Sequence, residues 1–517
     1  MSPTRTLLMM SAAIPLAACG ADDVASPGEG NIVVVTPAAP APPPPPPPPS
    51  GPAPSTARFD AITPASACPM GTTNTGTIDG DDDGSVDFRI CQVDGTITGT
   101  VTLQKLDGVV YSLGGRVDVG VDVGGDGMAA GGTQGILNID PGVVIIGAGT
   151  ADFLVVQRGS QLNAIGTQSS PITFTARANF QNETDGTGTV NADSIGLFGG
   201  LVILGRAPIN DCDSGNPAGG TADCQTEIEG TTGAFYGGDQ AMDDSGTLRY
   251  VQVRYPGFEV STGNELNGIS LGGVGAGTEF SYVQVHNSSD DGIEWFGGTV
   301  NGDHIVVTGA DDDSLDVDSG YNGVNQFIIV EQRAAGGDHY IEADSRFDNT
   351  PRSDPTFANF VFYGGGRSKN FGVLLREGIG GQLWNGLMTD KAECLNLDDA
   401  ETRDDGVPDF QSVVIDCPTA FGSEGNITVA EITTLWNLGA NNDESFSNSL
   451  TNGFVNGANE SGVTAFTDAS IQTVTYIGAV EEGATPWTQD WTCGLFGSDE
   501  QGTGNAGLSC LVTPFYG

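Results

Sequence analysis

A short strand pattern that recurs through the middle of the chain constrains the fold most. Triplets with an apolar residue at each end start at positions 269, 293, 315, 341, 373 and 395. A second series of apolar runs lies between them, at 283–285, 305–307, 328–330 and 413–415. Side chains that alternate with period two indicate strands with one face inside and one outside. A repeat of just over twenty residues, rich in β-branched residues and Gly, Asp and Asn turns, is typical of a solenoid. We therefore predict an all-β fold, a right-handed parallel β-helix.

The register of the triplets places carboxylates on one outward face. If the flanking apolar residues point inward, the middle residue of each triplet and the residue two positions later point outward. The acidic residues at these positions, which we call the acidic stripe, are Glu294, Asp316, Asp318, Glu342 and Asp344. Neighbouring strands lie about 4.8 Å apart, so these carboxylates would repel one another unless cations, Arg376 or raised pKa values offset the repulsion. The pattern fits a solvated face as well as a cation-binding stripe, and a slip of one residue would reverse it.

The N-terminal residues have the layout of an export signal followed by a tether. Residues 1–18 combine Arg5 with an apolar run that is too short to span a bilayer. The sequence Leu-Ala-Ala-Cys that ends at Cys19 resembles a bacterial lipobox, which implies lipidation of Cys19. An ordinary secretory signal is the alternative. No Asp follows Cys19, which by the same resemblance favours the outer membrane. Residues 19–57 contain the run Pro42 to Pro49, a polyproline spacer of roughly 25 Å.

The rest of the chain is expected to form one solenoid body. We expect an N-terminal segment at 58–100, the β-helix at 101–425 and a C-terminal cap at 426–517, with a short helix near 430–438. The chain has 18 Lys and Arg against 66 Asp and Glu, a formal net charge of -48. This charge excludes nucleic acid as a partner and suits a protein outside the cell.

The cysteines indicate an oxidising compartment. Apart from Cys19, eight cysteines fall into four close pairs along the sequence: Cys68 and Cys91, Cys212 and Cys224, Cys394 and Cys417, Cys493 and Cys510. An even number in an exported chain indicates disulfides, although spacing alone leaves their connectivity open.

One Asp-rich segment predicts a calcium loop. The ligand positions at its start are Asp79, Asp81, Asp83 and Asp87, with Gly84 at the sharp turn. Position 12 is Ile90 where an EF-hand needs Glu, so the segment instead resembles the short calcium loops of extracellular modules. Calcium is therefore the expected cofactor, and a plain acidic turn is the alternative.

Two longer motifs are similar to a family of Gram-negative surface lipoproteins with predicted β-helix folds. They are Phe-Gly-Gly-Leu-Val-Ile-Leu-Gly-Arg-Ala-Pro-Ile at 198–209 and Asp-Asp-Gly-Ile-Glu-Trp-Phe-Gly-Gly-Thr-Val at 290–300. The resemblance covers most of residues 130–510. It implies an exported protein often found alongside TonB-dependent receptors, and it supplies no catalytic residues. Our leading hypothesis is thus a non-catalytic binding or accessory lipoprotein, anchored in the outer membrane through Cys19 and active in nutrient capture, with a TonB-dependent receptor and a polysaccharide as expected partners.

A second resemblance leaves enzymatic activity open. Ser-Asp-Asp-Gly at 289–292 and Asp-Asp-Asp at 311–313 are similar to two motifs of polygalacturonase-type β-helix glycosidases. The resemblance implies Asp291, Asp312 and Asp313 as catalytic carboxylates in acid/base hydrolysis. The family's Gly-His-Gly motif is missing, since His339 stands in a different frame, and its Arg-Ile-Lys motif is absent. The alternative function is a galacturonase-like hydrolase, or a calcium-dependent lyase with Arg346 or Arg376 as base.

Overall fold

The computed structural model describes residues 62–80, 84–149, 151–181, 190–213, 217–261, 264–333, 336–423, 426–495 and 510. The chain divides into two compact units, 1–52 and 53–517, and every described residue belongs to the second. The export signal, Cys19 and the tether at 19–57 lie outside the described residues. What the sequence indicates for them remains a prediction.

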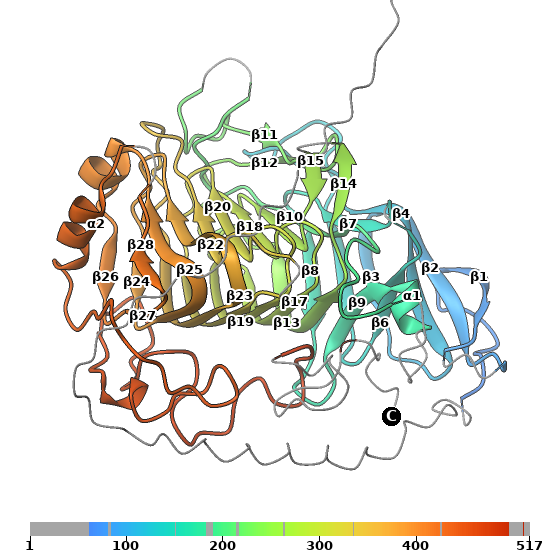
Figure 1. Cartoon of the computed structure of the whole chain (residues 1–517). Helices are drawn as coiled ribbons and strands as arrows, with labels where there is room; N and C mark the ends of the chain where they lie inside the picture. The colour runs from blue at the N-terminus through green and yellow to red at the C-terminus, as the bar shows by residue number, and fades with distance from the viewer. Residues whose placement is uncertain are drawn as a thin grey trace, which may run out of the picture. The chain divides into compact units, whose positions relative to one another are not determined.

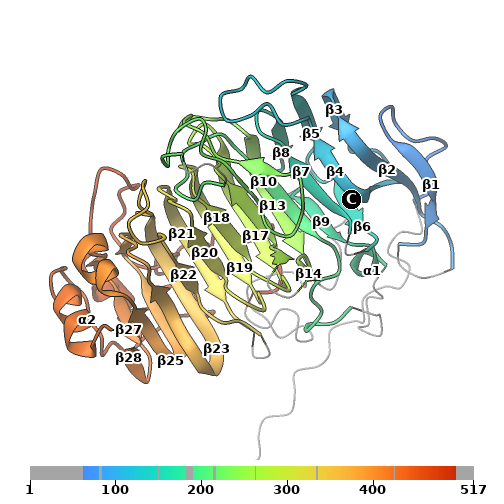
Figure 2. The same cartoon turned by 90° about the horizontal axis from the view of Figure 1, so that it is seen from above.

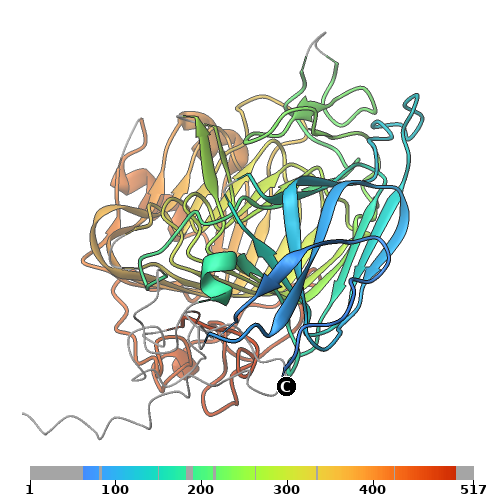
Figure 3. The same ribbon diagram turned by 90° about the vertical axis from the view of Figure 1, so that its right-hand side faces the viewer.

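The strands form a parallel β-helix, as predicted, in which most coils contribute to three stacks of strands (Figure 1). The antiparallel strand β1 (Thr73–Ile78) precedes the first coil and pairs with β2 (Phe88–Ile97). Parallel pairing begins between β2 and β4 (Val109–Val119) and continues to the last coil. Figure 2 shows strands of successive coils lying side by side, and Figure 3 shows them wound around one interior.

The first stack consists of β3 (Gly99–Leu103), β5 (Gly135–Ile139), β8 (Gln161–Ile165), the start of β13 (Gly246–Arg254), β17 (Glu279–His286), β19 (Asn301–Thr308), β21 (Val324–Glu331), β23 (Thr356–Leu375), β24 (Gln382–Trp384) and β26 (Asp409–Gln411). The second stack consists of β2, β4, β6 (Val144–Gly147), β9 (Ile172–Ala176), the later parts of β13, β17, β19 and β21, the middle of β23, β25 (Leu387–Leu397) and β27 (Val414–Asp416). Long strands thus bend from one stack into the next.

The third stack carries the triplets found in the sequence. It consists of the end of β4, β7 (Phe153–Val156), β10 (Gly200–Leu204), β16 (Ile269–Gly272), β18 (Ile293–Phe296), β20 (Leu315–Asp318), β22 (Ile341–Ala343), the ends of β23 and β25, and β28 (Thr419–Phe421). The first residues of the triplets, such as Ile293, Leu315 and Ile341, are fully buried and pair in register. Burying each of these side chains contributes about 1.5–3 kcal/mol, which fixes the register against slippage.

Two short hairpins lie outside the stacks. They are formed by β11 (Thr226–Glu227) with β12 (Phe235–Tyr236), and by β14 (Phe258–Ser261) with β15 (Asn264–Leu266). Ile209, Ile228 and Tyr236 pack against Val202 and Phe296, so the excursion between β10 and β13 covers part of the outer face of the third stack. A Cys212–Cys224 disulfide closes this excursion.

All four local cysteine pairs form disulfides, which the sequence had left open. The other three join Cys68 to Cys91, Cys394 to Cys417 and Cys493 to Cys510. The Cys68–Cys91 bond attaches the N-terminal segment to β2, and the Cys394–Cys417 bond links two neighbouring coils.

The C-terminal residues both cover the last coil and run back along the stack. Helix α2 (Val429–Trp436) starts with a capping box, and the ring of Trp436 packs on Phe410 and Phe421 of the last coil. Residues 464–495, which we call the C-terminal strap, then follow the side of the solenoid (Figure 1). Side-chain amides of three coils bind its backbone: Asn385 donates to Phe466 O, Asn359 to Tyr476 O and Gln284 to Cys493 O.

The remaining helical turns are short. They are α1 (Arg177–Phe180), the π-helical turn η1 (Thr402–Gly406) and the 3-10 turn η2 (Glu460–Gly462). Within the described ranges, none of the helices has both the length and the hydropathy that crossing a bilayer requires.

Candidate functional site

Three turns that precede third-stack strands carry the candidate site. Asp291, Asp313 and His339 each stand two residues before the first residue of a triplet, ahead of β18, β20 and β22. Because the strands pair in register, the turns stack too. The backbone N–H of Asp313 donates to Asp291 Oδ1 at 2.9 Å, and the backbone N–H of His339 donates to Asp313 Oδ1. The structure therefore brings Asp291, Asp313 and His339 together on three successive coils.

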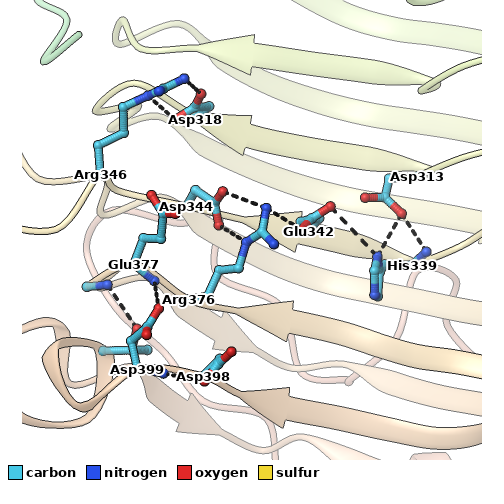
Figure 4. A network of polar contacts seen from close by, with 12 residues as sticks. Asp313, Asp318, His339, Glu342, Asp344, Arg346, Arg376, Glu377, Asp398 and Asp399 are labelled. Atoms are coloured by element: carbon cyan, nitrogen blue, oxygen red, sulfur yellow. Dashed lines mark hydrogen bonds and ion pairs between the residues drawn. The ribbon is translucent and has the colours of Figure 1, made fainter. Parts of the chain in front are cut away.

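His339 is the residue that the sequence analysis set aside. Its Nδ1 lies 2.9 Å from Asp313 Oδ1 and 4.0 Å from Glu342 Oε2. Figure 4 shows His339 pointing toward both carboxylates. From the sequence alone, His339 was compared with a Gly-His-Gly motif, did not match that motif, and so was not assigned to the site. Counting back two residues from Ile341 gives His339, just as the same count gives Asp313 from Leu315, so the signal was present in the sequence.

Burial and charge act against each other in this pair. Burial by itself lowers the pKa of His339, but the hydrogen bond and the charge of Asp313 raise that pKa overall. Burial by itself raises the pKa of Asp313, but the hydrogen bond and charge of His339 lower it overall. The two residues therefore favour an imidazolium paired with a carboxylate.

This pair and the carboxylates near it form three adjoining groups, two of which share a residue. Each group offers one ligand atom per residue, all within 4.8 Å of one another: Asp313, His339 and Glu342; Asp291, Glu294 and Asp316; Asp290, Asp291 and Asp312. We call these eight residues the carboxylate–histidine cluster. Asp291 belongs to two of the groups. The hydrogen bond from the backbone N–H of Asp313 to Asp291 joins them to the group that contains His339, so the cluster is continuous.

Exposure falls along the cluster from one end to the other. Asp312 is exposed and Asp290 is half-buried, whereas Asp291 and Asp313 are only 7% and 2% exposed. Glu294 is 6% exposed, and its Oε2 accepts a hydrogen bond from Nδ2 of the buried Asn267. A molecule from solvent would therefore meet Asp312 and Asp290 first.

Desolvation is the main cause of the altered acidity at this site. Burial, followed by the charge of Glu229, raises the pKa of Asp290 to about 8. Asp312 is the most exposed of these side chains, but its carboxyl adjoins buried neighbours, and this partial desolvation, followed by the charge of Asp313, raises its pKa to about 6. Burial also raises the pKa of Asp291, Glu294 and Asp316 well above the usual range, with like charges nearby adding to the effect. At neutral pH the cluster thus holds protons on some carboxyls and negative charge on others.

The acidic stripe has the predicted register but is more enclosed than a solvated face. Glu294 pairs with Asp316, and Asp316 with Glu342, at equivalent positions of β18, β20 and β22. Side-chain exposure is 15% for Asp318, 19% for Glu342 and 16% for Asp344.

Two arginines neutralise the far end of the stripe (Figure 4). Arg376 Nη2 lies 2.7 Å from Glu342 Oε1, and its Nε lies 2.7 Å from Asp344 Oδ1. Arg346 forms an ion pair with Asp318. Although burial opposes it, these carboxylates raise the pKa of both guanidinium groups. Arg376 therefore offsets the repulsion between carboxylates of the acidic stripe, as the sequence suggested.

The predicted calcium loop lies far along the chain from this cluster. Asp79 Oδ2 accepts the backbone N–H of Gly84, and Asp87 Oδ2 accepts that of Gly80. Asp87 is 1% exposed. Asp81 and Asp83 lie outside the described residues. These bonds shape a turn, and calcium binding here stays a prediction.

The arrangement suits two kinds of chemistry. Three carboxylate oxygens from Asp291, Glu294 and Asp316 within 4.8 Å are the type of ligand that a hard divalent cation prefers. Adjacent carboxyls with different proton affinities suit general acid/base catalysis.

Comparison with known proteins supports the fold. The model of a family described as the pectate-lyase-like β-helix domain matches residues 95–492, which is more than half of the chain. A search of curated proteins and a search of solved structures gave no significant match.

Proposed function

Because the chain belongs to the family of pectate-lyase-like β-helix domains, we propose that it acts on a polysaccharide outside the cytoplasm. The observation that carries the proposal is the proximity of Asp290, Asp291 and Asp312, whose carboxylate oxygens lie within 4.8 Å of one another at the exposed end of the carboxylate–histidine cluster. These groups lie close together yet differ in acidity, which is the condition for a general acid beside an ionised nucleophile.

The reaction that fits this end of the cluster is hydrolysis of a glycosidic bond. Asp290, with its pKa raised to about 8, holds a proton at neutral pH and donates it to the leaving glycosidic oxygen. Asp312, with a pKa of about 6, is mostly ionised. Carboxylate oxygens of Asp290 and Asp312 lie within 4.8 Å, which is too close for a water between them, so Asp312 attacks the anomeric carbon as a nucleophile. The bond from the anomeric carbon to the leaving oxygen breaks as the bond to Asp312 forms. Water then gives a proton to Asp290, bonds to the anomeric carbon and releases Asp312. Asp291 and Asp313, which the polygalacturonase resemblance suggested, lie behind these two. After burial and the charge of Glu229, the charge of Asp313 is among those that keep Asp290 protonated.

The charges favour hydrolysis of an uncharged chain over elimination from a uronate. A polyuronate would bring further carboxylates to a cluster that already has excess negative charge, and each contact would cost energy unless cations intervened. Arg346 and Arg376, the expected bases of a lyase, are held in ion pairs that raise their pKa. A catalytic base must be deprotonated before it can accept a proton. An arginine whose pKa is raised by an ion pair stays protonated and therefore does not serve as that base.

The test is release of reducing ends from polysaccharides. Glucan, xylan, mannan, galactan and homogalacturonan are incubated with wild type, Asp290→Asn and Asp312→Asn. We expect hydrolysis of at least one neutral polymer, reduced about 100-fold or more in each variant. Asp398→Asn is the matched control, because Asp398 directly follows the end of β25, two coils beyond β22, and lies outside the cluster. Absence of hydrolysis by folded wild-type protein would contradict an enzymatic role.

A non-catalytic surface role is the second candidate. The observation that favours it is the burial of Asp291 and Asp313, which limits access to the inner part of the cluster. In this role the protein would bind a polysaccharide next to a TonB-dependent receptor in nutrient capture. This role would be supported if the protein binds a polysaccharide saturably and releases no reducing ends from it.

The location that we propose is the outer membrane, at the cell surface. Four disulfides favour an oxidising compartment. The lipid anchor rests on the lipobox resemblance at Cys19. Cys19→Ser should abolish incorporation of labelled palmitate, and unchanged labelling would rule out this anchor.

A further inference from the structure

A groove of about 520 Å³ lies on the outer face of the first stack. Outward side chains of β17, β19 and β21 form its floor, and Ser470 and Gln472 of the C-terminal strap form one wall. The carboxylate–histidine cluster lies at the third stack, so the two sites are separate. The volume falls in the range of roughly 300–1,000 Å³ that is typical of ligand pockets.

The floor is a ladder of polar groups on successive strands. Glu279 stands opposite Asn301, and Ser281 opposite Asp303, so hydrogen-bonding groups repeat at the strand spacing of about 4.8 Å. Ser281 Oγ donates to Glu279 Oε1 at 3.0 Å, and Asn301 Oδ1 accepts the backbone N–H of Val324. These bonds hold the side chains in place and leave the second oxygen of Glu279 and the Nδ2 of Asn301 for a ligand.

The net charge of the groove is small, unlike that of the chain as a whole. Arg249 Nη1 lies 3.3 Å from Glu279 Oε1, and the side chains of this pair are 42% and 44% exposed. His304 Nδ1 lies 2.7 Å from Asp303 Oδ1. Because Glu279 is paired with a cation and Asp303 is bonded to a ring nitrogen, the groove attracts neither a polyanion nor a polycation strongly. Its many donors and acceptors instead match a ligand rich in hydroxyl groups.

The wall of the groove is fixed before any ligand arrives. Gln326 Nε2 donates to the backbone oxygen of Gln472 at 2.9 Å, and the backbone N–H of Gln472 donates to Gln326 Oε1 at 2.7 Å. Tyr282 and Phe327 also line the groove, and both rings are stacked on His304 between them, with centroids 4.2 and 4.8 Å away. Rigid walls reduce the entropy that binding must overcome.

We propose that this groove binds an uncharged saccharide chain. The free carboxylate oxygens of Glu279 and Asp303 accept hydrogen bonds from sugar hydroxyls, and Arg249 and Asn301 donate to hydroxyl and ring oxygens. The ring edge of the half-buried Tyr282 contacts the apolar face of a sugar ring. This site goes beyond the proposed hydrolysis, because it needs none of the cluster residues. It would hold a polymer on a second face of the solenoid.

Calorimetric titration with cellohexaose, xylohexaose and mannohexaose tests the proposal. The titrations use the full chain carrying Asp290→Asn, so that cleavage at the cluster does not consume the ligand. We expect saturable binding of at least one hexasaccharide. Glu279→Ala and Asp303→Ala, each made in the same background, should raise its Kd about tenfold or more, because each removes a charged acceptor.

Asn138→Ala is the matched control. Asn138 lies on the same stack three coils earlier, in β5, and outside the groove, so its loss should leave Kd unchanged. The proposal is overturned if none of the three hexasaccharides binds, if both groove variants bind as tightly as their parent, or if trigalacturonate binds as well as the neutral chains. Binding that is intact here while the reducing-end test fails would separate this site from the proposed enzyme.

Discussion

Nδ1 of His339 lies 2.9 Å from Oδ1 of Asp313, although the two residues are 26 positions apart in the sequence. The contact exists because β20 and β22 pair in register, so that the turns preceding them stack. One consequence is that the charge state of the candidate site depends on coil-to-coil register and not on local sequence. A second is that His339 reports on Asp313 and can be observed separately, since the chain has three histidines.

Asp313→Asn should lower the pKa of His339. The substitution removes the negative charge that outweighs burial and keeps this imidazole protonated. The measurement is a proton NMR titration of the histidine ring signals. His304 serves as an internal control, because its carboxylate neighbour is Asp303. An unchanged His339 titration in the variant would show that the two side chains do not interact in solution.

The free energy of unfolding should decrease as pH rises from about 5 to about 8. Burial raises the pKa of Glu342 and Asp290 to about 8, above the value of about 4 that a carboxyl has in an unfolded chain. Between these two pKa values the folded state binds more protons at such groups than the unfolded state does. The stability that they contribute is therefore complete below pH 4 and is lost as pH rises through 8. Each proton contributes a slope of at most about 1.4 kcal/mol per pH unit.

Denaturant titrations at several pH values measure this dependence. Glu342→Gln should flatten the curve, because the variant cannot lose a proton at this position. The exposed Glu481→Gln provides the comparison and should leave the curve unchanged. If the free energy of unfolding instead rises between pH 5 and 8, the prediction is wrong, and the pKa values of these carboxyls are not raised in the folded protein.

The Cys68–Cys91 disulfide should contribute about 3 kcal/mol to stability. It closes a loop with a sequence separation of 23, and loop-closure entropy gives this magnitude. Replacing both cysteines with Ala should lower the denaturation midpoint, and the Cys212 and Cys224 double replacement should cost somewhat less, since its separation is 12. Equal midpoints for wild type with and without reductant would contradict both expectations.

The sequence predicted the repeat and its register because both follow from periodicity. Alternation in Ile293-Glu294-Trp295 is enough to place Trp295 inside and Glu294 outside, and the structure confirms this. The enclosure of Glu294 could not be predicted in this way. It depends on Glu229, which lies in the excursion between β10 and β13, and on Asn267, which stands two residues before Ile269 in the preceding coil. Nδ2 of Asn267 donates hydrogen bonds to Oε1 of Glu229 and to Oε2 of Glu294.

The path of the C-terminal strap was equally hidden. Its residues have no apolar period, since they are held by side chains of the solenoid and not by a pattern of their own. Gln284 and Gln326 are buried amides on strands whose sequence otherwise reads as core. A buried Gln at an outward position indicates that something covers it, but pairing it with a backbone 146 residues away requires the fold.

The last prediction decides whether the carboxylate–histidine cluster holds a cation. In chelator, Asp316→Asn should stabilise the protein, because it replaces a carboxyl whose ionised form is disfavoured by burial and by the charge of Asp313. With calcium bound by Asp291, Glu294 and Asp316, the same substitution should destabilise it, because a ligand is lost. A calcium concentration 100 times the Kd would stabilise wild type by about 2.7 kcal/mol. Thermal melts of both proteins, in EDTA and in calcium, give four midpoints. A change of sign between the two conditions supports a cation in the cluster. If calcium shifts both proteins equally, its site lies elsewhere, and loss of the shift in Asp79→Asn would assign it to the loop at 79–87.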